Sequence, residues 1–422
     1  MTNKKLIDEF FEKASKKINE YEFKVSHRKK PEDFSRERVL SFQVTVLLLL
    51  NIVRKSMSIE VYNFFNKVLH SEKEVGAEAL EKARMKLSHT AFVELFEDGV
   101  EIGLSSENPH LYQGYRVTPI DGSLVLLPNT KEVRECFGVT TPVKGSMYAR
   151  ISGALDVLNG FLIDADIQPF TVGERAMALR HIEKINIANA MYLFDRGYWS
   201  PEIVAKICDK GQKFVMRLAS NACPEVTKNT CNSGKITLEH NGKSYSLRYF
   251  KFELPSGEME YLLTNVSEDE IDDESLKELY AMRWGIETKY RELKSFLQLE
   301  NFTGKKVEII KQDFFATVLV SNMAAFAALA SDELIQEEIA EKQLSRTYET
   351  NKNFVIGALK DTMVKILIED DPLLRSSMLD KLKNQLSKHK TCTNRIRVNN
   401  KREHRKINES KKRKKHTTKM SI

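Results

Sequence analysis

The dipeptide Asn159-Gly160 constrains the fold most strongly, because it separates two apolar, β-branched segments, 147–158 and 161–168. An Asn-Gly pair between such segments is the strongest short-range signal of a β-hairpin. Two shorter runs of the same kind, 116–121 and 124–127, precede the hairpin. These segments predict a trio of strands linked through a hairpin.

The segment after the hairpin alternates between helix and strand patterns. A helix is predicted over 173–185 and a buried strand over 190–194. Ser200-Pro201-Glu202 then combines a cap residue, a proline and an acid, which together favour the start of a helix. A further strand is predicted over 213–218. The order β-β-β-α-β-α-β predicts an α/β fold with a mixed sheet flanked by helices.

Segment 219–263 interrupts the alternation, since it is rich in Asn, Ser, Thr and Gly and contains alternating strand patterns. We interpret it as a β-rich insertion. Helical patterns dominate both ends of the chain. The predicted organisation is a helical N-terminal DNA-binding region over 1–110, an α/β domain over 111–345 containing the insertion, a helical C-terminal region over 346–393, and a basic tail over 394–422.

Composition excludes several classes of protein. Of the 422 residues, 41% are hydrophobic and 30% charged, with 18 Gly and 10 Pro, which excludes collagen-like and wholly disordered chains. Five scattered cysteines do not form a disulfide framework, so we expect a reducing, cytoplasmic setting. The most apolar run, 44–50, is far shorter than the roughly 20 residues of a membrane helix. It predicts a buried helix, and we expect no membrane partner.

The charge is concentrated at the C-terminus. Residues 394–422 hold twelve Lys and Arg against two acids, a net charge of +10, whereas the whole chain carries +7. Such a tail predicts a polyanionic partner, with Arg395 and Arg397 as candidate DNA contacts. The alternative is a solvated tail that aids solubility. Arg84, in an N-terminal helical stretch, is a further candidate contact within a DNA-reading module.

Two acids follow predicted strands. Asp195 ends the run MYLFD just before a glycine turn, and the carboxyl ends of strands are where chemistry occurs in open α/β sheets. Asp121 follows the run YRVTPI and precedes Gly122. Both positions also suit ordinary turn or cap residues. Asp156, Asp164 and Asp166 lie in the same strand region, and we expect these three at an exposed face or a strand edge.

A third acid lies in a predicted helix spanning about 273–297. At about 100° per residue, Tyr280, Arg283, Glu287 and Lys294 fall within a stripe about 60° wide. Trp284 lies beside this stripe, off the apolar face, so we expect it to be exposed and able to stack on a base. The alternative is a solvated, ion-paired face. The apolar face opposite comprises Leu279, Met282, Ile286, Leu293 and Leu297.

These motifs together resemble the DDE transposases of the "insertion sequence four" family. The helix matches the signature Y-x2-R-x3-E-x6-K, and IDGS around Asp121, ALDVLNGFLIDADIQPF at 154–170 and FDRGYWS around Asp195 occur in the matching order. The resemblance covers about residues 30–345. It implies a ribonuclease H-like catalytic domain with a β-rich insertion between the second and third acids.

The resemblance also implies the site. Asp121, Asp195 and Glu287 would form the catalytic triad and hold two Mg²⁺ ions, with Mn²⁺ able to replace them. Hard cations of this kind prefer carboxylate oxygen, and two of them can promote in-line displacement at phosphorus. DNA contacts are expected from Tyr280, Arg283, Trp284 and Lys294. Some relatives cut through a DNA hairpin with a flipped base stacked on an aromatic at the position of Trp284.

The implied function is a DNA transposase that cuts at the terminal inverted repeats of its element and joins the ends to target DNA. Its partners would be double-stranded DNA and a second copy of itself in the synaptic complex, at the nucleoid in the cytoplasm. Two alternatives stay open, namely a non-catalytic DNA-binding relative and a structure-specific nuclease. The sequence has neither an HExxH zinc motif nor a P-loop, which disfavours zinc and ATP chemistry.

Overall fold

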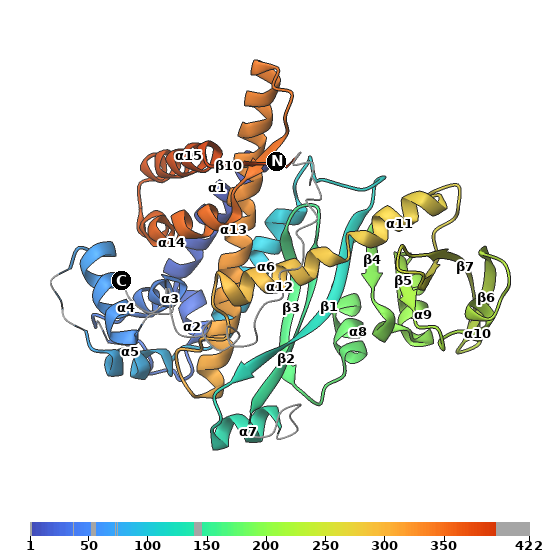
Figure 1. Cartoon of the computed structure of the whole chain (residues 1–422). Coiled ribbons are helices and arrows are strands. Elements are labelled where there is room, and N and C mark those ends of the chain that lie inside the picture. Colours follow the sequence, from blue (N-terminus) through green and yellow to red (C-terminus); the bar gives the residue numbers. More distant parts are fainter. Residues whose placement is uncertain are drawn as a thin grey trace, which may run out of the picture.

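The computed structural model describes residues 2–393 except 37, 52–55, 72, 74 and 139–145 (Figure 1). Its centre is an eight-stranded sheet of order β3-β2-β1-β4-β5-β8-β7-β6. The first three strands are antiparallel, and β4 and β5 run parallel to β1. The strands are β1 Arg116–Leu127, β2 Met147–Asp156, β3 Phe161–Pro169, β4 Ala190–Phe194, β5 Lys213–Leu218, β6 Ser233–His240, β7 Lys243–Glu253 and β8 Met259–Thr264.

This sheet confirms the predicted fold class of an α/β protein with a mixed sheet flanked by helices. The bounds of β4 and β5 are those predicted. The hairpin between β2 and β3 is also present, but its turn covers residues 157–160 rather than two residues. The strand ends early because the buried carboxylate of Asp156 accepts hydrogen bonds from the backbone and side-chain nitrogens of Asn159.

The runs 116–121 and 124–127 form one strand, so no turn separates them. β1 pairs with β2 from Ile120↔Ala154 to Leu127↔Met147, and Asp121 lies opposite Gly153. The simple Asp-Gly turn that the sequence also allowed is therefore wrong. Asp121 is held inside a paired strand, whose backbone position is fixed from both sides.

The β-rich insertion extends the sheet instead of interrupting it. β8 pairs antiparallel with β5 from Val215↔Thr264 to Leu218↔Tyr261, and β7 and β6 continue the sheet outwards. The side chains of β6 alternate between exposed and half-buried, as expected for a strand at the edge of a sheet. The insertion thus lies next to β5, and β5 separates it from β4, the strand that leads to Asp195 (Figure 1).

A 36-residue helix, α13 (Val307–Lys342), is the core of the helical part (Figure 1). It packs against α1 (Asn3–Asn19), α6 (Thr90–Leu104), α14 (Lys352–Ile368) and α15 (Pro372–Lys388). The N-terminal and C-terminal helical regions, which the sequence predicted separately, therefore pack together. The other helices are α2 Tyr21–His27, α3 Phe42–Asn51, α4 Met57–Asn63, η1 Phe64–Val68, α5 Ala77–Arg84, α7 Lys131–Phe137, α8 Glu174–Lys184, η2 Arg196–Tyr198, α9 Pro201–Asp209, α10 Pro224–Thr227, α11 Asp273–Ala281 and α12 Trp284–Ser295.

α13 joins the helical part to the sheet. Its Asn322 side chain accepts a hydrogen bond from Leu162 N and donates one to Leu162 O, both at 2.8 Å, and so covers the backbone of the edge strand β3. Two short strands, β9 (Tyr348–Thr350) and β10 (Lys390–Cys392), pair beside the C-terminal helices. The helical layer and the sheet thus share one core.

Two helices are strongly apolar, as membrane-spanning helices are. α3 contains the apolar run 44–50 and is buried, as predicted. α13 is long and apolar enough to cross a membrane by composition alone, yet 89% of its most apolar window is buried against the rest of the protein. In the part of the chain that the structure describes, it is a core helix.

Candidate active site

Asp121 and Asp195 lie at the same level on adjacent parallel strands. β1 pairs with β4 from Arg116↔Ala190 to Pro119↔Leu193, and two further residues along each chain lead to Asp121 and Asp195. Asp195 follows the last residue of β4, and its Oδ1 caps η2 by accepting a hydrogen bond from Arg196 N at 2.7 Å. The register therefore brings the two predicted acids together at the carboxyl end of β4.

The carboxylate of Asp121 is mostly buried. Its Oδ1 accepts hydrogen bonds from Gly122 N at 2.8 Å and from Tyr198 Oη at 3.2 Å. Burial raises the pKa of Asp121 to about 6, and the nearby Arg283 guanidinium opposes this rise. Asp121 is thus an acid that an added positive charge would help to ionise.

Arg283 connects the third acid to the first. Its Nη2 donates to Glu287 Oε1 at 2.9 Å, and its Nη1 lies 3.9 Å from Asp121 Oδ2. Tyr280 Oη donates to Asp195 Oδ1 at 3.5 Å. Burial raises the pKa of Tyr280, so its hydroxyl stays a donor. The structure therefore brings Asp121, Asp195, Glu287, Tyr280 and Arg283 into one site.

The predicted helix around Glu287 is broken. It divides into α11 and α12, and a tight turn at Met282 and Arg283 joins them, with Arg283 N donating to Tyr280 O at 3.0 Å. The turn directs Tyr280 and Arg283 inwards, so they are 7% and 3% exposed. The alternative of a solvated face is therefore wrong for these two residues.

Trp284 is exposed, as predicted, with 56% of its surface accessible. The Arg283 guanidinium lies 4.7 Å from the centre of its ring, in a cation–π arrangement. The outward face of the indole is available beside the acids.

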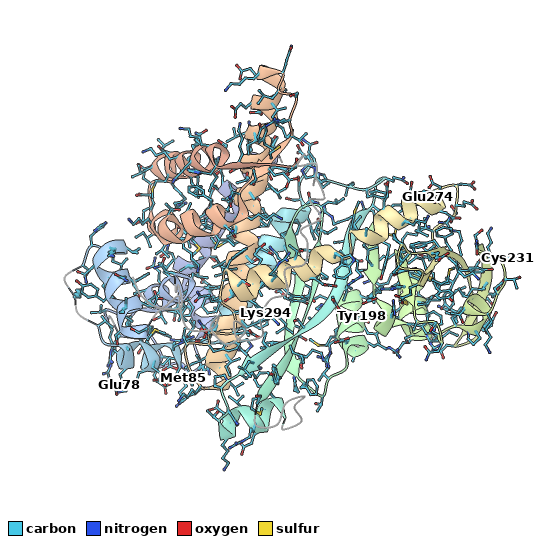
Figure 2. The ribbon with its side chains drawn as sticks, in the orientation of Figure 1. Glu78, Met85, Tyr198, Cys231, Glu274 and Lys294 are labelled. Atoms are coloured by element: carbon cyan, nitrogen blue, oxygen red, sulfur yellow. The ribbon has the colours of Figure 1, made fainter. Side chains whose placement is uncertain are left out.

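Lys294 also points into this region but has protein partners. Its Nζ donates to Ser123 Oγ at 2.9 Å and to Leu124 O at 2.5 Å. Burial lowers the pKa of Lys294. Figure 2 shows Lys294 and Tyr198 in the region where α12 crosses β1. Lys294 therefore fastens α12 to the strand that carries Asp121.

The expectation that Arg84 contacts DNA is wrong. Its side chain is 2% exposed and forms an ion pair with Asp313 at 2.8 Å, with further hydrogen bonds to Gln312 and Thr303. All these partners belong to α13 or the loop before it, so Arg84 ties the N-terminal helices to the core. The other two predicted basic contacts, Arg395 and Arg397, lie outside the described residues.

The donor set of the three acids suits a hard divalent cation, because carboxylate oxygens are the ligands that Mg²⁺ prefers. Within the described residues, however, no three acidic, His or Cys side chains converge as metal ligands. The reason is visible in the site, since Arg283 is paired with Glu287 and faces Asp121. Arg283 thus holds one oxygen of Glu287, the one that accepts from its guanidinium.

Three further residues at the site were missed from the sequence. Tyr290 Oη donates to the Asp121 carbonyl at 2.6 Å. Glu174 forms an ion pair with Arg150, and a Cβ at Gly122 would lie 3.1 Å from Glu174 Cγ. Glu260, buried on β8, is paired with Arg217. The sequence indicated only one of these contacts, since a glycine at position 122, inside the IDGS motif, allows Glu174 to approach the backbone closely.

The remaining strand acids differ from expectation. Asp156 is fully buried and paired with Arg116. Asp164 lies on the edge strand β3, as one alternative held, yet only 6% of it is exposed. Asp166 is half-buried and accepts hydrogen bonds from Gln168. The exposed position is therefore wrong for Asp156 and Asp164, because each has a buried hydrogen-bond partner, Arg116 and His181 respectively.

The chain matches a known protein family. The family model described as the transposase DDE domain matches residues 112–323, half of the chain. The transposase for insertion sequence element IS421 of Escherichia coli and the transposase InsL of IS186A of E. coli strain K12 are each 36% identical over 78 residues. That match spans 18% of this chain and 19% of each relative, about a fifth of their length.

A solved structure of similar outline is the piggyBac transposase synaptic complex with hairpin DNA. It has a TM-score of 0.46 and 13% sequence identity, and the superposition covers 91% of this chain and 84% of that chain. The likeness is too low to inform the function.

Proposed function

Because the chain belongs to the transposase DDE domain family, we propose that it is a DNA transposase of the "insertion sequence four" type. Asp121, Asp195 and Glu287 are its catalytic carboxylates. One observation carries the assignment: Arg283 and Tyr280 reach all three acids, although these come from two strands and a helix far apart in sequence. A purely structural role would need one acid as the partner of Arg283, and it would not explain why three acids meet near the carboxyl end of β4.

The three acids are also the proposed ligands of Mg²⁺, with Mn²⁺ able to replace it. Two such cations supply activation of the attacking oxygen and stabilisation of the leaving oxygen during displacement at phosphorus. The chain's own contribution is to hold the carboxylates. Gly122 N and Tyr198 Oη orient Asp121, and Arg196 N orients Asp195.

The basic and aromatic side chains around the acids are proposed to bind the DNA strand. If Glu287 held a cation, Arg283 would be available to bind a phosphate in a bidentate manner. Lys294 and Tyr280 contact the backbone on either side. Trp284, exposed above Arg283, stacks on a flipped base, as a hairpin route of cleavage requires.

The proposed substrates are the terminal inverted repeats of the element and a target DNA duplex. Joining two ends to one target requires that two active sites meet, so the working complex is a homodimer on DNA. We place this activity at the nucleoid, in the cytoplasm.

A cleavage assay tests the proposal. Asp121→Asn, Asp195→Asn and Glu287→Gln should each abolish Mg²⁺-dependent cutting of end-sequence DNA, while binding of that DNA persists. Affinity comes mainly from phosphate contacts elsewhere, whereas each carboxylate is needed for the metal geometry. Asp166→Asn, a matched change on β3, two strands away from β1, should cut normally. Near-wild-type cleavage by Asp195→Asn would remove the assignment, and cutting of any branched DNA without end preference would favour a nuclease.

A further inference from the structure

A chain of three buried polar side chains leads from β3 to the backbone of Asp121. His181 Nδ1 lies 2.7 Å from Asp164 Oδ2, and His181 Nε2 lies 2.9 Å from Ser152 Oγ. Ser152 Oγ in turn donates to the Asp121 carbonyl at 3.1 Å. His181 is 1% exposed, Ser152 2% and Asp164 6%. None of these residues belongs to the proposed catalytic or DNA-binding set.

The hydrogen bonds give the three side chains a fixed order. The Asp121 carbonyl oxygen only accepts, so the Ser152 hydroxyl donates to it. Both ring nitrogens of His181 have a partner, Ser152 Oγ on one side and the Asp164 carboxylate on the other. The imidazole is therefore held in one orientation between β2 and β3.

Charged side chains on α8 and α6 lie around Asp164. Lys184 on α8 donates to the other oxygen of Asp164 at 2.9 Å and is shared with Glu97 on α6. Burial raises the pKa of Asp164, but its interactions with His181 and Lys184 outweigh this effect and hold the pKa below the usual value. The carboxylate is consequently ionised and able to accept from both His181 and Lys184.

The end of the chain is the backbone of the first catalytic acid. The Asp121 carbonyl accepts from Ser152 on β2 and from Tyr290 Oη on α12. These two bonds fasten β1 at Asp121 from both a neighbouring strand and the helix that carries Glu287. A rotation of this peptide would move the Asp121 carboxylate relative to Asp195.

We propose that Asp164, His181 and Ser152 form a positioning relay that fixes the Asp121 backbone, and with it the metal-binding carboxylate. The relay deepens the proposed function and rests on it, since it assumes that Asp121 binds the metal. A buried charged chain is a costly way to stabilise a sheet, because each ion must be desolvated. Its connection to Asp121 gives it a role in the site.

The first test measures metal binding as well as cleavage. Ser152→Ala and His181→Gln should weaken Mn²⁺ affinity, measured by titration calorimetry, by roughly 10- to 100-fold, the usual effect of losing a residue that orients a metal ligand. The cleavage rate at saturating DNA should fall by a similar factor while DNA affinity is kept. Asp166→Asn, on the same strand as Asp164 but outside the relay, should leave both unchanged.

The variants must be compared as folded proteins, because these residues are buried. The melting temperature and the Mn²⁺ titration of each variant distinguish a purely structural role from a role in positioning the Asp121 carboxylate. A lower melting temperature with wild-type Mn²⁺ affinity and cleavage per folded molecule would make the chain purely structural and overturn the relay. Wild-type protein that binds Mn²⁺ through Asp121 but cuts no DNA would refute the proposed function, and the relay would still be judged on Mn²⁺ affinity. Wild-type protein that binds no Mn²⁺ would overturn both.

The second test needs no activity. In protein labelled with ¹⁵N at histidine, the His181 ring signals, assigned by their loss in His181→Gln, should shift in Ser152→Ala and in Asp164→Asn, because each variant removes one hydrogen-bond partner of the ring. Ring signals that keep their wild-type positions in both variants would overturn the relay.

Discussion

Asp121 carries a carboxylate that the fold makes harder to ionise than an exposed one. Burial raises its pKa to about 6, above the ordinary value of 3.8, and the Arg283 guanidinium only partly offsets this. A divalent cation at the proposed site would favour the ionised form, because it supplies the opposite charge. The stability of the cation-free protein and the proposed metal binding are therefore opposed at this residue.

The opposition predicts a pH dependence of stability. A carboxyl whose pKa is raised on folding stabilises the protein fully below its unfolded pKa, and this contribution is lost as pH rises through the folded pKa. Without divalent cations, Asp121→Asn should therefore raise the free energy of unfolding by about 1–3 kcal/mol near pH 8, and by much less near pH 4. Denaturant unfolding at several pH values measures the difference. A difference that does not change with pH would contradict the raised pKa.

Trp284 gives a second prediction at the residue scale. Because 56% of it is exposed, Trp284→Ala should unfold at nearly the wild-type temperature, whereas removal of a core Trp costs about 3–5 kcal/mol. If it stacks on DNA, the variant should lose on the order of 1–3 kcal/mol for that base and accumulate nicked DNA. Trp284→Phe should restore part of the activity. A time course of nicked and double-cut product decides, and normal double cutting by Trp284→Ala would refute the stacking role.

At the scale of elements, α12 is placed by a close approach at its first turn. A Cβ at Gly285 would overlap Val157 Cγ2, in the turn between β2 and β3. Gly285→Ala should therefore destabilise the protein by about 1–3 kcal/mol, although alanine favours helix. It should also reduce cleavage, because α12 carries Glu287.

Gly357 provides the matched control in another helix. It lies within α14, and a Cβ there would meet nothing within 4 Å. Gly357→Ala should stabilise the protein by about 0.5–1 kcal/mol through the lower backbone entropy of the unfolded chain. Thermal unfolding of both variants measures the contrast. Equal effects would mean that Gly285 has room and that its packing against Val157 does not position α12.

Local sequence patterns were sufficient to predict most helices and strands and the positions of the acids relative to them. The apolar run MYLFD predicted β4 and placed Asp195 directly after it, and both agree with the structure. What the sequence could not predict depends on partners far along the chain. β1 is continuous because β2 pairs with it throughout, and Arg84 is buried because Asp313, 229 positions later, neutralises it.

The same limit applies to the helix around Glu287. Its apolar residues were placed on the correct face, but a count of 100° per residue assumes one unbroken helix. The turn at Met282 and Arg283 lets Tyr280, near the end of α11, and Arg283, just before α12, both face the acids. No glycine or proline at residues 282 and 283 indicates this break in the sequence.

At the scale of the whole molecule, the two ends of the described chain stabilise each other. Lys383 on α15 forms ion pairs with Asp8 on α1 at 2.9 Å and with Asp380 at 2.8 Å. Ser15 on α1 donates to Leu367 O at 2.8 Å. The helical layer therefore cannot be divided at a sequence boundary, and truncation from either end would expose the core around α13. The basic tail beyond residue 393 is the part whose removal spares these interactions.

Deletion of residues 394–422 tests whether this tail binds DNA. The deletion removes a net charge of +10. If the tail binds phosphates, DNA binding should weaken for all sequences alike, and the slope of log K against log salt should become shallower by roughly 0.9 for each phosphate that the shortened chain no longer neutralises. Preference for the end sequence should persist, because phosphate contacts carry no sequence information. Salt titrations of the full and shortened chains, with melting temperature as the control for folding, measure both. An unchanged slope would identify the tail as a solvated appendage and leave recognition of DNA to the folded part.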